Sequence, residues 1–338
     1  MPDPFVRFPR RTLLEGVTPI QRLTRLEQAL GGRGVPAIFV KRDDLTGLGG
    51  GGNKLRKLEY LLGAALAAGC DTFITTGARQ SNHARLSAAA AVRAGLACEL
   101  VLTDRVPRDD EAYRRNGNVL LDDLLGATVH RLPATGDALS VAKQRVQALQ
   151  AQGRQAYVVG AGGSSPTGCL GYANCAVEIT RQEVELGLRF DQIVVPNGSS
   201  GTHAGLLAGM VASDDDPCRV CSYTVLAPLA EARADTRTLS REVLDLFGAD
   251  HRVTDDDVVV GGDALGEGYG IPTKATIDTV RLVARTEGLL LDPVYGGKAM
   301  AGLLGDVRAG RWSGGHKLLF VMTGGLPGLF AYEPAFRT

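Results

Sequence analysis

The sequence predicts an α/β protein made of open twisted sheets in two domains. Short apolar segments typical of buried strands alternate with longer amphipathic segments typical of helices, and this alternation is the order of βαβ units. Glycine-rich or small polar turns adjoin several of these segments, and such turns converge on a ligand crevice in α/β folds. A chain of 338 residues is long enough for two domains.

Composition narrows the functional class. Hydrophobic residues make up 44% of the chain, enough for a substantial core, and 37 basic residues balance 37 acidic ones. We therefore expect neither a nucleic-acid partner nor a membrane-surface partner. No apolar run reaches ~18 residues and the first residues show no signal-peptide pattern, so a cytoplasmic location is expected. The six cysteines are scattered, which favours reduced thiols and no metal site.

The elements are expected in a regular order. A lead-in helix and its connector occupy 12–36, because Ile20, Leu23 and Leu26 fall at helical spacing. The expected strands are 38–40, 72–76, 96–102, a segment ending near 132, 157–159, 192–195, 220–226 and 317–322. The expected helices, besides one that follows Lys54, are 83–94, 117–126, 137–152, 168–186, 203–212, 229–247 and 274–287.

The glycine-rich stretch before the helix that follows Lys54 gives the first indication of chemistry. Four glycines, 49–52, lead through Asn53 into Lys54. The apolar residues that follow share one helical face: Leu55, Leu58, Leu62, Ala65 and Leu66. Lys54 therefore stands at a loop-to-helix junction, where a partly desolvated amine can lose its proton and attack a carbonyl. A solvated lysine in a flexible loop is the alternative.

A second turn, which follows the predicted strand 192–195, suits a phosphate. Its residues are Gly198, Ser199, Ser200, Gly201 and Thr202. Successive N–H groups in such a turn, with the N-terminus of the next helix, favour a phosphate dianion. Neither the dinucleotide fingerprint nor the P-loop pattern is present, so a single phosphate fits better. A lysine nucleophile and a cup for one phosphate together indicate pyridoxal phosphate, whose ring is an electron sink.

A third turn ends in Ser81, Asn82 and His83, at the predicted start of a helix. Free N–H groups and the helix dipole at such a point favour a substrate carboxylate. The alternative role for Ser81 is a helix cap, and the two roles are compatible.

Eight segments, in order along most of the chain, carry a family resemblance. They are Lys41-Arg42-Asp43-Asp44, Gly51-Gly52-Asn53-Lys54, Gln80-Ser81-Asn82-His83, Asn116-Gly117-Asn118, 198–205, Gly268-Tyr269-Gly270-Ile271-Pro272, Leu291-Asp292-Pro293-Val294-Tyr295 and Thr323-Gly324-Gly325. The chain resembles the fold type II, tryptophan-synthase-β-like pyridoxal-phosphate enzymes. Within them it is similar to the D-cysteine desulfhydrase and 1-aminocyclopropane-1-carboxylate (ACC) deaminase group.

The resemblance implies a role for each matching residue. Lys54 resembles the Schiff-base lysine, and Asn82 the partner of the cofactor's ring hydroxyl. The residues from Gly198 to Thr202 resemble the phosphate loop. Ser81, with the backbone around Asn82 and His83, resembles the carboxylate site and a proton relay.

The resemblance extends to two tyrosines and to the domain division. Tyr269 and Tyr295 resemble the two tyrosines that flank substrate and cofactor. Residues 1–54 and 166–338 would form a large cofactor-binding domain, and 55–165 a small inserted α/β domain.

Two positions favour the desulfhydrase branch. By resemblance, ACC deaminases carry Glu after the motif tyrosine and Leu before the final Gly-Gly, whereas desulfhydrases carry a hydroxyl residue at both. Thr323 matches the desulfhydrase pattern, while Gly296 departs from both patterns. Without a carboxylate beside it, the ring nitrogen has at most a hydroxyl partner, here Thr323. The weaker electron sink that results suits β-elimination of a good leaving group.

We therefore predict an α,β-eliminating lyase that converts D-cysteine to pyruvate, ammonia and hydrogen sulfide. The alternative is an L-cysteate sulfo-lyase, which segments 116–123 and 166–175 also resemble, and an ACC deaminase is the third choice. Arg79 is a candidate sulfonate partner, with a solvent-facing arginine as the competing interpretation. A small amino-acid substrate and a homodimer are expected. A two-domain binding protein without catalysis is the competing class, but it gives Lys54 no task.

Overall fold

The computed structural model describes residues 5–249, 253–262 and 264–337, and it contains two sheets. The larger sheet has the strand order β1-β2-β10-β7-β8-β9. Its strands are β1 (Ile20–Arg22), β2 (Ala37–Lys41), β7 (Gln192–Asn197), β8 (Val220–Thr224), β9 (Val259–Gly261) and β10 (Lys317–Val321). All neighbouring strands are parallel except β1, which pairs antiparallel with β2.

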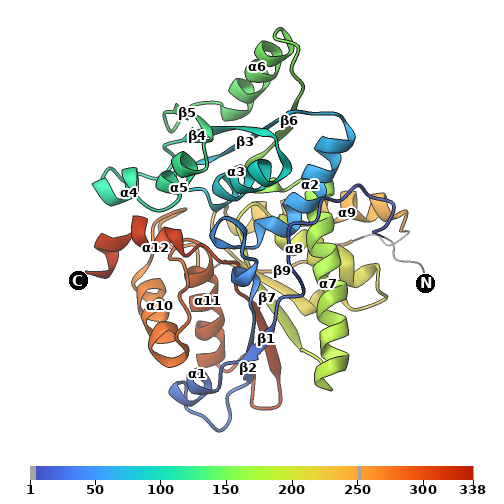
Figure 1. The fold of residues 1–338 in the computed structure, drawn as a ribbon. Coiled ribbons are helices and arrows are strands. Elements are labelled where there is room, and N and C mark those ends of the chain that lie inside the picture. Colours follow the sequence, from blue (N-terminus) through green and yellow to red (C-terminus); the bar gives the residue numbers. More distant parts are fainter. Residues whose placement is uncertain (1–4, 250–252, 263, 338) are drawn as a thin grey trace.

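The smaller sheet is formed by four parallel strands in the order β5-β4-β3-β6. They are β3 (Thr72–Ala78), β4 (Ala97–Thr103), β5 (Thr128–Leu132) and β6 (Ala156–Val159). All four lie between β2 and β7 in the sequence, and Figure 1 shows them above the larger sheet. The domain boundaries at 54/55 and 165/166 stay a prediction.

Helices connect the strands. They are α1 (Thr24–Ala29), α2 (Lys54–Ala67), α3 (Asn82–Ala94), α4 (Glu111–Arg115), α5 (Asn118–Leu124), α6 (Ala138–Gln150), α7 (Pro166–Leu186), α8 (Gly201–Val211), α9 (Leu229–Phe247), α10 (Lys274–Glu287), α11 (Gly296–Arg308) and α12 (Pro327–Ala331).

Both faces of the larger sheet are covered, because successive residues of a strand point to opposite faces. In β7, Val194 packs with the helices α1, α10 and α11 on one face, while Ile193 and Val195 pack with α7 and α8 on the other. In β10, Phe320 and Leu319 divide between the same two faces. Figure 1 shows α10 and α11 on the left of this sheet and α7 and α8 on the right.

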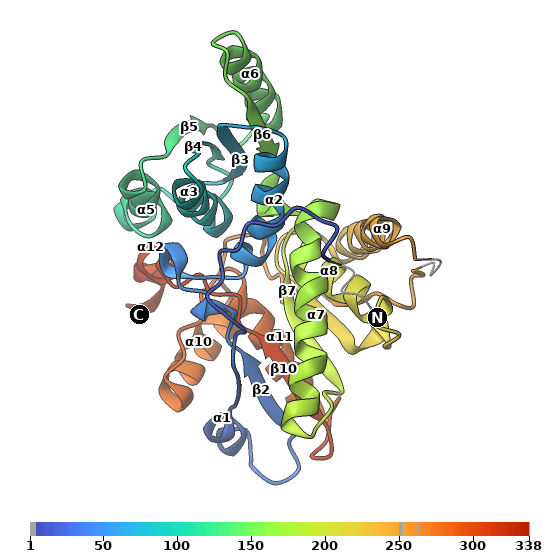
Figure 2. The ribbon, with the colours of Figure 1, turned by 45° about the vertical axis from the view of Figure 1, so that its right-hand side comes forward.

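The smaller sheet follows the same rule. Phe73 of β3 faces α2 and α3, while its neighbour Ile74 faces α6. In Figure 2, α3 and α6 lie on either side of this sheet, and α2 descends from it toward the larger sheet. Helix α2 also packs against α7, so it joins the two sheets.

The predicted α/β class, with two open sheets, is confirmed. The lead-in helix over 12–36 is wrong: Ile20–Arg22 form β1, and the helix covers only Thr24–Ala29. Ile20 packs on the face of the larger sheet that α7 and α8 cover, whereas Leu23 and Leu26 pack on the opposite face, so the three residues do not share one helical face. Strand β9 and helices α4, α11 and α12 were not predicted, whereas the other predicted strands and helices are present with small shifts of their ends.

No helix in the described ranges is both long and apolar enough to cross a membrane.

Candidate active site

A cavity of about 420 Å³ lies where the two sheets face each other. Its lining comes from loops at the carboxyl ends of parallel strands in both sheets, the usual place for a ligand in an α/β fold. The carboxyl ends of the smaller sheet's strands and the residues that follow them provide Gly77, Ser81, Asn82, His83, Arg105, Thr135 and Gly162. Those after the larger sheet's strands provide Gly198, Ser199, Ser200, Gly201, Thr202, Leu226 and Thr323. The remaining predicted residues, Lys54, Tyr269 and Tyr295, also line it.

Lys54 is the first residue of α2, as the sequence predicts, and its side chain lines the cavity. Burial lowers the pKa of its amine well below the usual value, and the neighbouring charge of Lys57 lowers it further. The carboxylate of Asp292 opposes this shift without cancelling it. A neutral, desolvated amine is the reactive form for attack on a carbonyl.

Lys57, one turn along α2, was not predicted and serves a different purpose. Its fully buried amine donates to the carbonyl of Gly162 (3.1 Å) and to Ser164 Oγ (2.9 Å). Burial lowers the pKa of Lys57 to about 8. A Cβ on Gly201 would lie 2.5 Å from Lys57 Nζ, so this amine sits directly beneath the second glycine turn.

The glycine-serine turn has the shape of an anion cup. Ser200 adopts a left-handed conformation (φ 60°), and α8 begins at the next residue, so the start of its dipole faces the cavity. Asn197, at the end of β7, accepts from the backbone N–H of Ser200 at 3.2 Å and holds the turn. Thr202 Oγ1 accepts from Asn53 Nδ2 at 3.2 Å, which ties the turn to the residue before Lys54.

Ser81 caps helix α3 and keeps one free donor. Its Oγ accepts from the N–H of Ala84 at 3.1 Å, so its own hydrogen remains available to the cavity. A Cβ on Gly77 would lie 2.7 Å from Ser81 Oγ, which explains a glycine at the end of β3. Within the described residues, the N–H groups of Asn82 and His83 have no acceptor, so both are free for a carboxylate.

The amide of Asn82 is oriented by a second asparagine. Asn118 Nδ2 donates to Asn82 Oδ1 at 2.9 Å, which leaves Asn82 Nδ2 as a donor toward the cavity. Asn118 is itself held, because its Oδ1 accepts from the buried Arg85 at 3.1 Å. Arg85 also donates to the carbonyls of Gly49 and Gly51, at 2.6 and 2.9 Å. One arginine therefore links the glycine loop before Lys54 to the residue predicted to bind the ring hydroxyl.

His83 is neutral, and its tautomer follows from its neighbours. Thr75 Oγ1 donates to the carbonyl of Val159 (3.0 Å), so it accepts from His83 Nε2 at 2.9 Å. Burial lowers the pKa of His83 well below its usual value, and the charges of Lys54 and Lys57 add to the effect. The sequence indicated only the backbone of His83, but the imidazole lines the cavity as well.

Tyr269 and Tyr295 meet at the cavity, with their hydroxyl oxygens 2.5 Å apart. The turn that carries Tyr295 is fixed by Asp292, which accepts from the N–H groups of Val294, Tyr295 and Gly296 at 2.8–2.9 Å. Burial raises the pKa of Asp292 to about 6, against the effect of these three donors.

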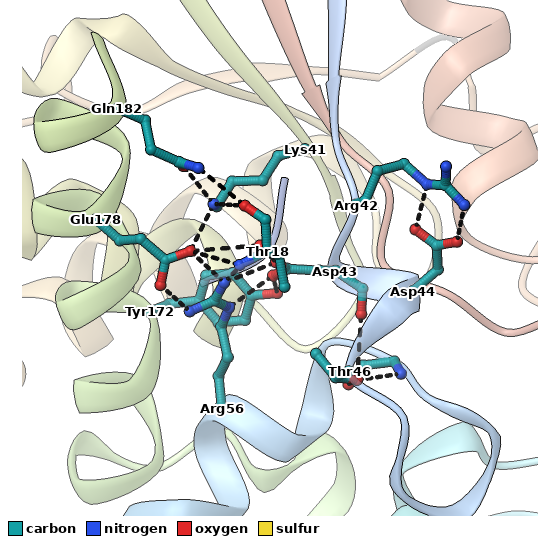
Figure 3. Close-up of polar contacts among 11 residues, drawn as sticks. Thr18, Lys41, Arg42, Asp43, Asp44, Thr46, Arg56, Tyr172, Glu178 and Gln182 are labelled. Carbon is teal, nitrogen blue, oxygen red and sulfur yellow. Dashed lines mark hydrogen bonds and ion pairs between the residues drawn. The ribbon is translucent and has the colours of Figure 1, made fainter. Parts of the chain in front are cut away.

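A buried ionic network stands behind α2 (Figure 3). Arg56 donates from Nε and Nη2 to the two oxygens of Asp43 at 2.9 and 2.8 Å, and from Nη1 to Glu178 at 2.9 Å. Lys41 donates to Glu178 at 2.6 Å, and Tyr172 donates to Asp43 at 2.6 Å. Burial favours the neutral form of Asp43, but the charge and hydrogen bonds of Arg56, with Lys41 and Tyr172, together outweigh it and leave the pKa below its usual value.

The Lys41–Asp44 segment therefore holds the loop rather than forming a surface network. Asp43 and Lys41 are fully buried, and only the Arg42–Asp44 pair (2.8 Å) is partly exposed. Thr46, just after this segment, accepts from the N–H of Gly52 at 2.8 Å and donates to its carbonyl at 3.1 Å. The glycine loop is thus fixed two residues before Lys54.

The comparisons with known proteins agree with this geometry. A family model described as pyridoxal-phosphate dependent enzyme matches residues 11–324. The chain belongs to this family. An ACC deaminase from Methylobacterium sp. (strain 4-46) is 41% identical over 336 residues, 98% of each chain. A D-cysteine desulfhydrase from Salmonella typhi is 41% identical over 329 residues, 97% of each chain. The crystal structure of an ACC deaminase homologue has a TM-score of 0.86 at 36% identity, covering 98% of this chain and 97% of that chain.

The protein is thus a pyridoxal-phosphate-dependent lyase of fold type II, as the sequence predicted, and not a binding protein without catalysis. The residues present fit the cofactor. A lysine whose amine pKa is lowered by burial, a backbone anion cup and an amide donor line one cavity, and glycines keep it open. A Cβ on Gly198 would lie 3.2 Å from the Tyr295 ring, and a Cβ on Gly325 would lie 2.8 Å from Asn82 Nδ2.

The arginine that lines the cavity of this enzyme is not the one considered from the sequence. Arg79 pairs with Asp104 at 2.6 Å and is not among the cavity residues. Arg105, in the loop after β4, lines the cavity instead. An exposed arginine in a polar stretch has no periodic or motif signal, so only the fold shows where it lies.

Proposed function

We propose that the enzyme is an α,β-eliminating lyase that converts D-cysteine to pyruvate, ammonia and hydrogen sulfide. The observation that carries the proposal is the combination of a glycine at position 296 with a threonine at position 323. Thr323 lines the cavity, and its hydroxyl has no partner within the described residues. Gly296 contributes only a backbone N–H, already donated to Asp292 at 2.8 Å. No side chain at 296 reaches toward the ring nitrogen, so its partner is at most a hydroxyl.

The chain's own groups can divide the work of an elimination. Pyridoxal phosphate, when bound, supplies an electron sink for the electron pair left on the substrate's Cα. The Ser81 hydroxyl and the free N–H groups of Asn82 and His83 bind the substrate carboxylate. The neutral amine of Lys54 accepts the Cα proton, since its lowered pKa makes it a base near neutral pH.

The paired tyrosines complete the proposal. The hydroxyl of Tyr295 or of Tyr269 donates a proton to the departing sulfur, and the 2.5 Å contact between them lets one replenish the other. The phosphate is held by the turn from Gly198 to Thr202, with Lys57 beneath it.

Two other substrates compete. An L-cysteate sulfo-lyase would use the same groups and release sulfite. The similarity to a relative named ACC deaminase, 41% identical, supports the cyclopropane acid as the second competing substrate. Opening its ring needs stronger electron withdrawal by the cofactor than β-elimination does. A homodimer and a cytoplasmic location belong to the proposal as well.

Two measurements test the proposal. The purified protein should be yellow, and borohydride should fix the cofactor to Lys54, as peptide mass spectrometry would show. A panel of D-cysteine, 3-chloro-D-alanine, L-cysteate and ACC is then scored for keto acid and for sulfide or sulfite. We expect pyruvate from D-cysteine and 3-chloro-D-alanine. Efficient formation of 2-oxobutyrate from ACC would contradict the argument from Gly296 and Thr323.

A further inference from the structure

The charges that line the cavity are all of one sign. Lys54 and Arg105 are its basic side chains, burial lowers the pKa of Lys54, and none of the lining residues in the described ranges is an aspartate or a glutamate. Arg105 follows β4 in the smaller sheet, so it approaches the cavity from a different strand end than Ser81 does. Its side chain is exposed to solvent at the cavity.

Arg105 differs from Arg79 and Arg108, which are both held by ion pairs. Arg79 is paired with Asp104 at 2.6 Å, and Arg108 with Asp110 at 2.7 Å. Arg108 also stacks over the ring of Tyr332 at 4.6 Å. Arg105 has no hydrogen-bond or ion-pair partner in the part of the chain that the structure describes. A guanidinium with free donors in a ligand cavity is suited to bind a planar or tetrahedral anion.

The other anions of the reaction already have partners. The α-carboxylate has Ser81 and the free N–H groups at the start of α3, and the cofactor phosphate has the turn before α8. Burial raises the pKa of Tyr269, and the positive charge of Arg105 partly opposes that rise. Arg105 thus acts electrostatically on Tyr269, one of the two tyrosines proposed to donate a proton to the leaving group.

We propose that Arg105 binds the β-substituent of the substrate and selects amino acids whose β-substituent is anionic. This rests on the proposed function, because only there do the carboxylate and phosphate occupy the other sites. For D-cysteine the group bound is the thiolate, and for cysteate it is the sulfonate. Neutral substituents of the same size gain nothing from Arg105.

The test compares two isosteric amino acids that differ only in side-chain charge. Aspartate and asparagine, each as D and L, are titrated into the holoenzyme, and binding is followed by the change in cofactor absorbance. This readout needs no turnover, so it remains valid if the elimination itself is disproved. In the wild type, aspartate should bind on the order of five- to tenfold more tightly than asparagine, and added salt should reduce the preference because Arg105 is exposed.

Three variants then locate the effect. Arg105→Gln should bring the ratio of the two affinities close to one, whereas Arg105→Lys should retain part of the preference. Arg79→Gln is the matched control, since it removes a paired arginine outside the cavity, and should leave the ratio as in the wild type. The proposal is overturned if the wild type shows no preference for aspartate. It is also overturned if Arg105→Gln weakens both ligands equally, which would assign Arg105 to the shared α-carboxylate.

Discussion

The two sides of helix α2 treat charge in opposite ways. Arg56 points to one side, where its guanidinium, Asp43, Lys41 and Glu178 pair with one another in a buried network (Figure 3). Lys54, two residues earlier and so about 200° around the helix, points into the cavity, where burial lowers its pKa. The basic residues on the two sides of α2 therefore have different roles. Paired charges hold the helix, whereas Lys54 has no ion-pair partner among the described residues and faces the ligand cavity.

Removal of Lys54 should have the largest effect on turnover and little effect on folding. Lys54→Ala removes the nucleophile and the proposed base, so pyruvate formation should fall by at least about a thousandfold. The free energy of unfolding of the apoprotein should stay within about 1 kcal/mol of the wild type, because the amine makes no ion pair that stabilises the fold. Urea denaturation and a pyruvate assay measure the two quantities. A variant that keeps normal turnover would contradict the assignment of Lys54.

The opposite outcome is expected on the other side of α2. Asp43→Ala leaves the buried Arg56 and Lys41 with one carboxylate between them, which should lower the free energy of unfolding by about 3–5 kcal/mol. Asp44→Ala is the matched control, since it breaks the partly exposed pair with Arg42 and should cost about 0–1 kcal/mol. Equal losses in the two variants, measured by urea denaturation, would show that the network is not the element that holds α2.

Ser81 both stabilises the fold, as the cap of a helix, and faces the ligand cavity. Ser81→Ala should reduce turnover by about a hundredfold, through loss of a hydrogen bond at the carboxylate. The lost cap should lower stability by about 1 kcal/mol. Cofactor absorbance should remain, which separates slow turnover from loss of cofactor. If turnover is unchanged while stability falls, Ser81 is only a helix cap.

The smallest effect is expected for His203, which is buried without a charged partner among the described residues, and it concerns the pH dependence of the free energy of unfolding. Burial lowers its pKa to about 3, from about 6.5 in an unfolded chain. Because the folded pKa is lowered, the stability from neutral His203 is present above about pH 6.5 and is lost as the pH falls toward 3. Between pH 7 and pH 5 the loss should be about 2 kcal/mol.

The measurement is the difference in unfolding free energy at the two pH values for wild type and His203→Gln. The variant should show a smaller acid loss, by about 2 kcal/mol. His316→Gln, at a partly exposed histidine, is the control and should behave as the wild type does. An acid loss unchanged in His203→Gln would show that another group dominates.

Where local signals were strong, the sequence predicted the fold well. Helices α9 and α10 match because their apolar residues repeat at helical spacing over fourteen to nineteen residues. Helix α11 was missed because it opens with Gly296 and Gly297 and contains two more glycines, which carry low helix propensity. It is stabilised by packing on the larger sheet, where Leu303 is fully buried. Tertiary contacts of this kind are not visible in a local pattern.

The candidate site divides in the same way. Residues in turns with unusual composition, such as Lys54, Ser81 and Thr202, were found from the sequence and all line one cavity. Lys57 and Asn118 were not assigned roles, because their importance comes from contacts made by residues more than thirty positions away. Arg105 lies in an ordinary polar stretch, and only the folded chain places it at the ligand.

The position of β10 has a consequence for how this enzyme is made. The strand lies between β2 and β7 in the middle of the larger sheet, yet it is the last strand in sequence order among the described residues. During synthesis, the edges of β2 and β7 that pair with β10 therefore stay unpaired until residues 317–321 leave the ribosome. Such unpaired edges can form hydrogen bonds with strands of other chains. The carbonyl of Thr323, just beyond β10, then accepts from the N–H of Asn53. The loop before the reactive lysine gains this hydrogen bond only after Thr323 has been synthesised, so a chain that stops before this residue has an incomplete active site.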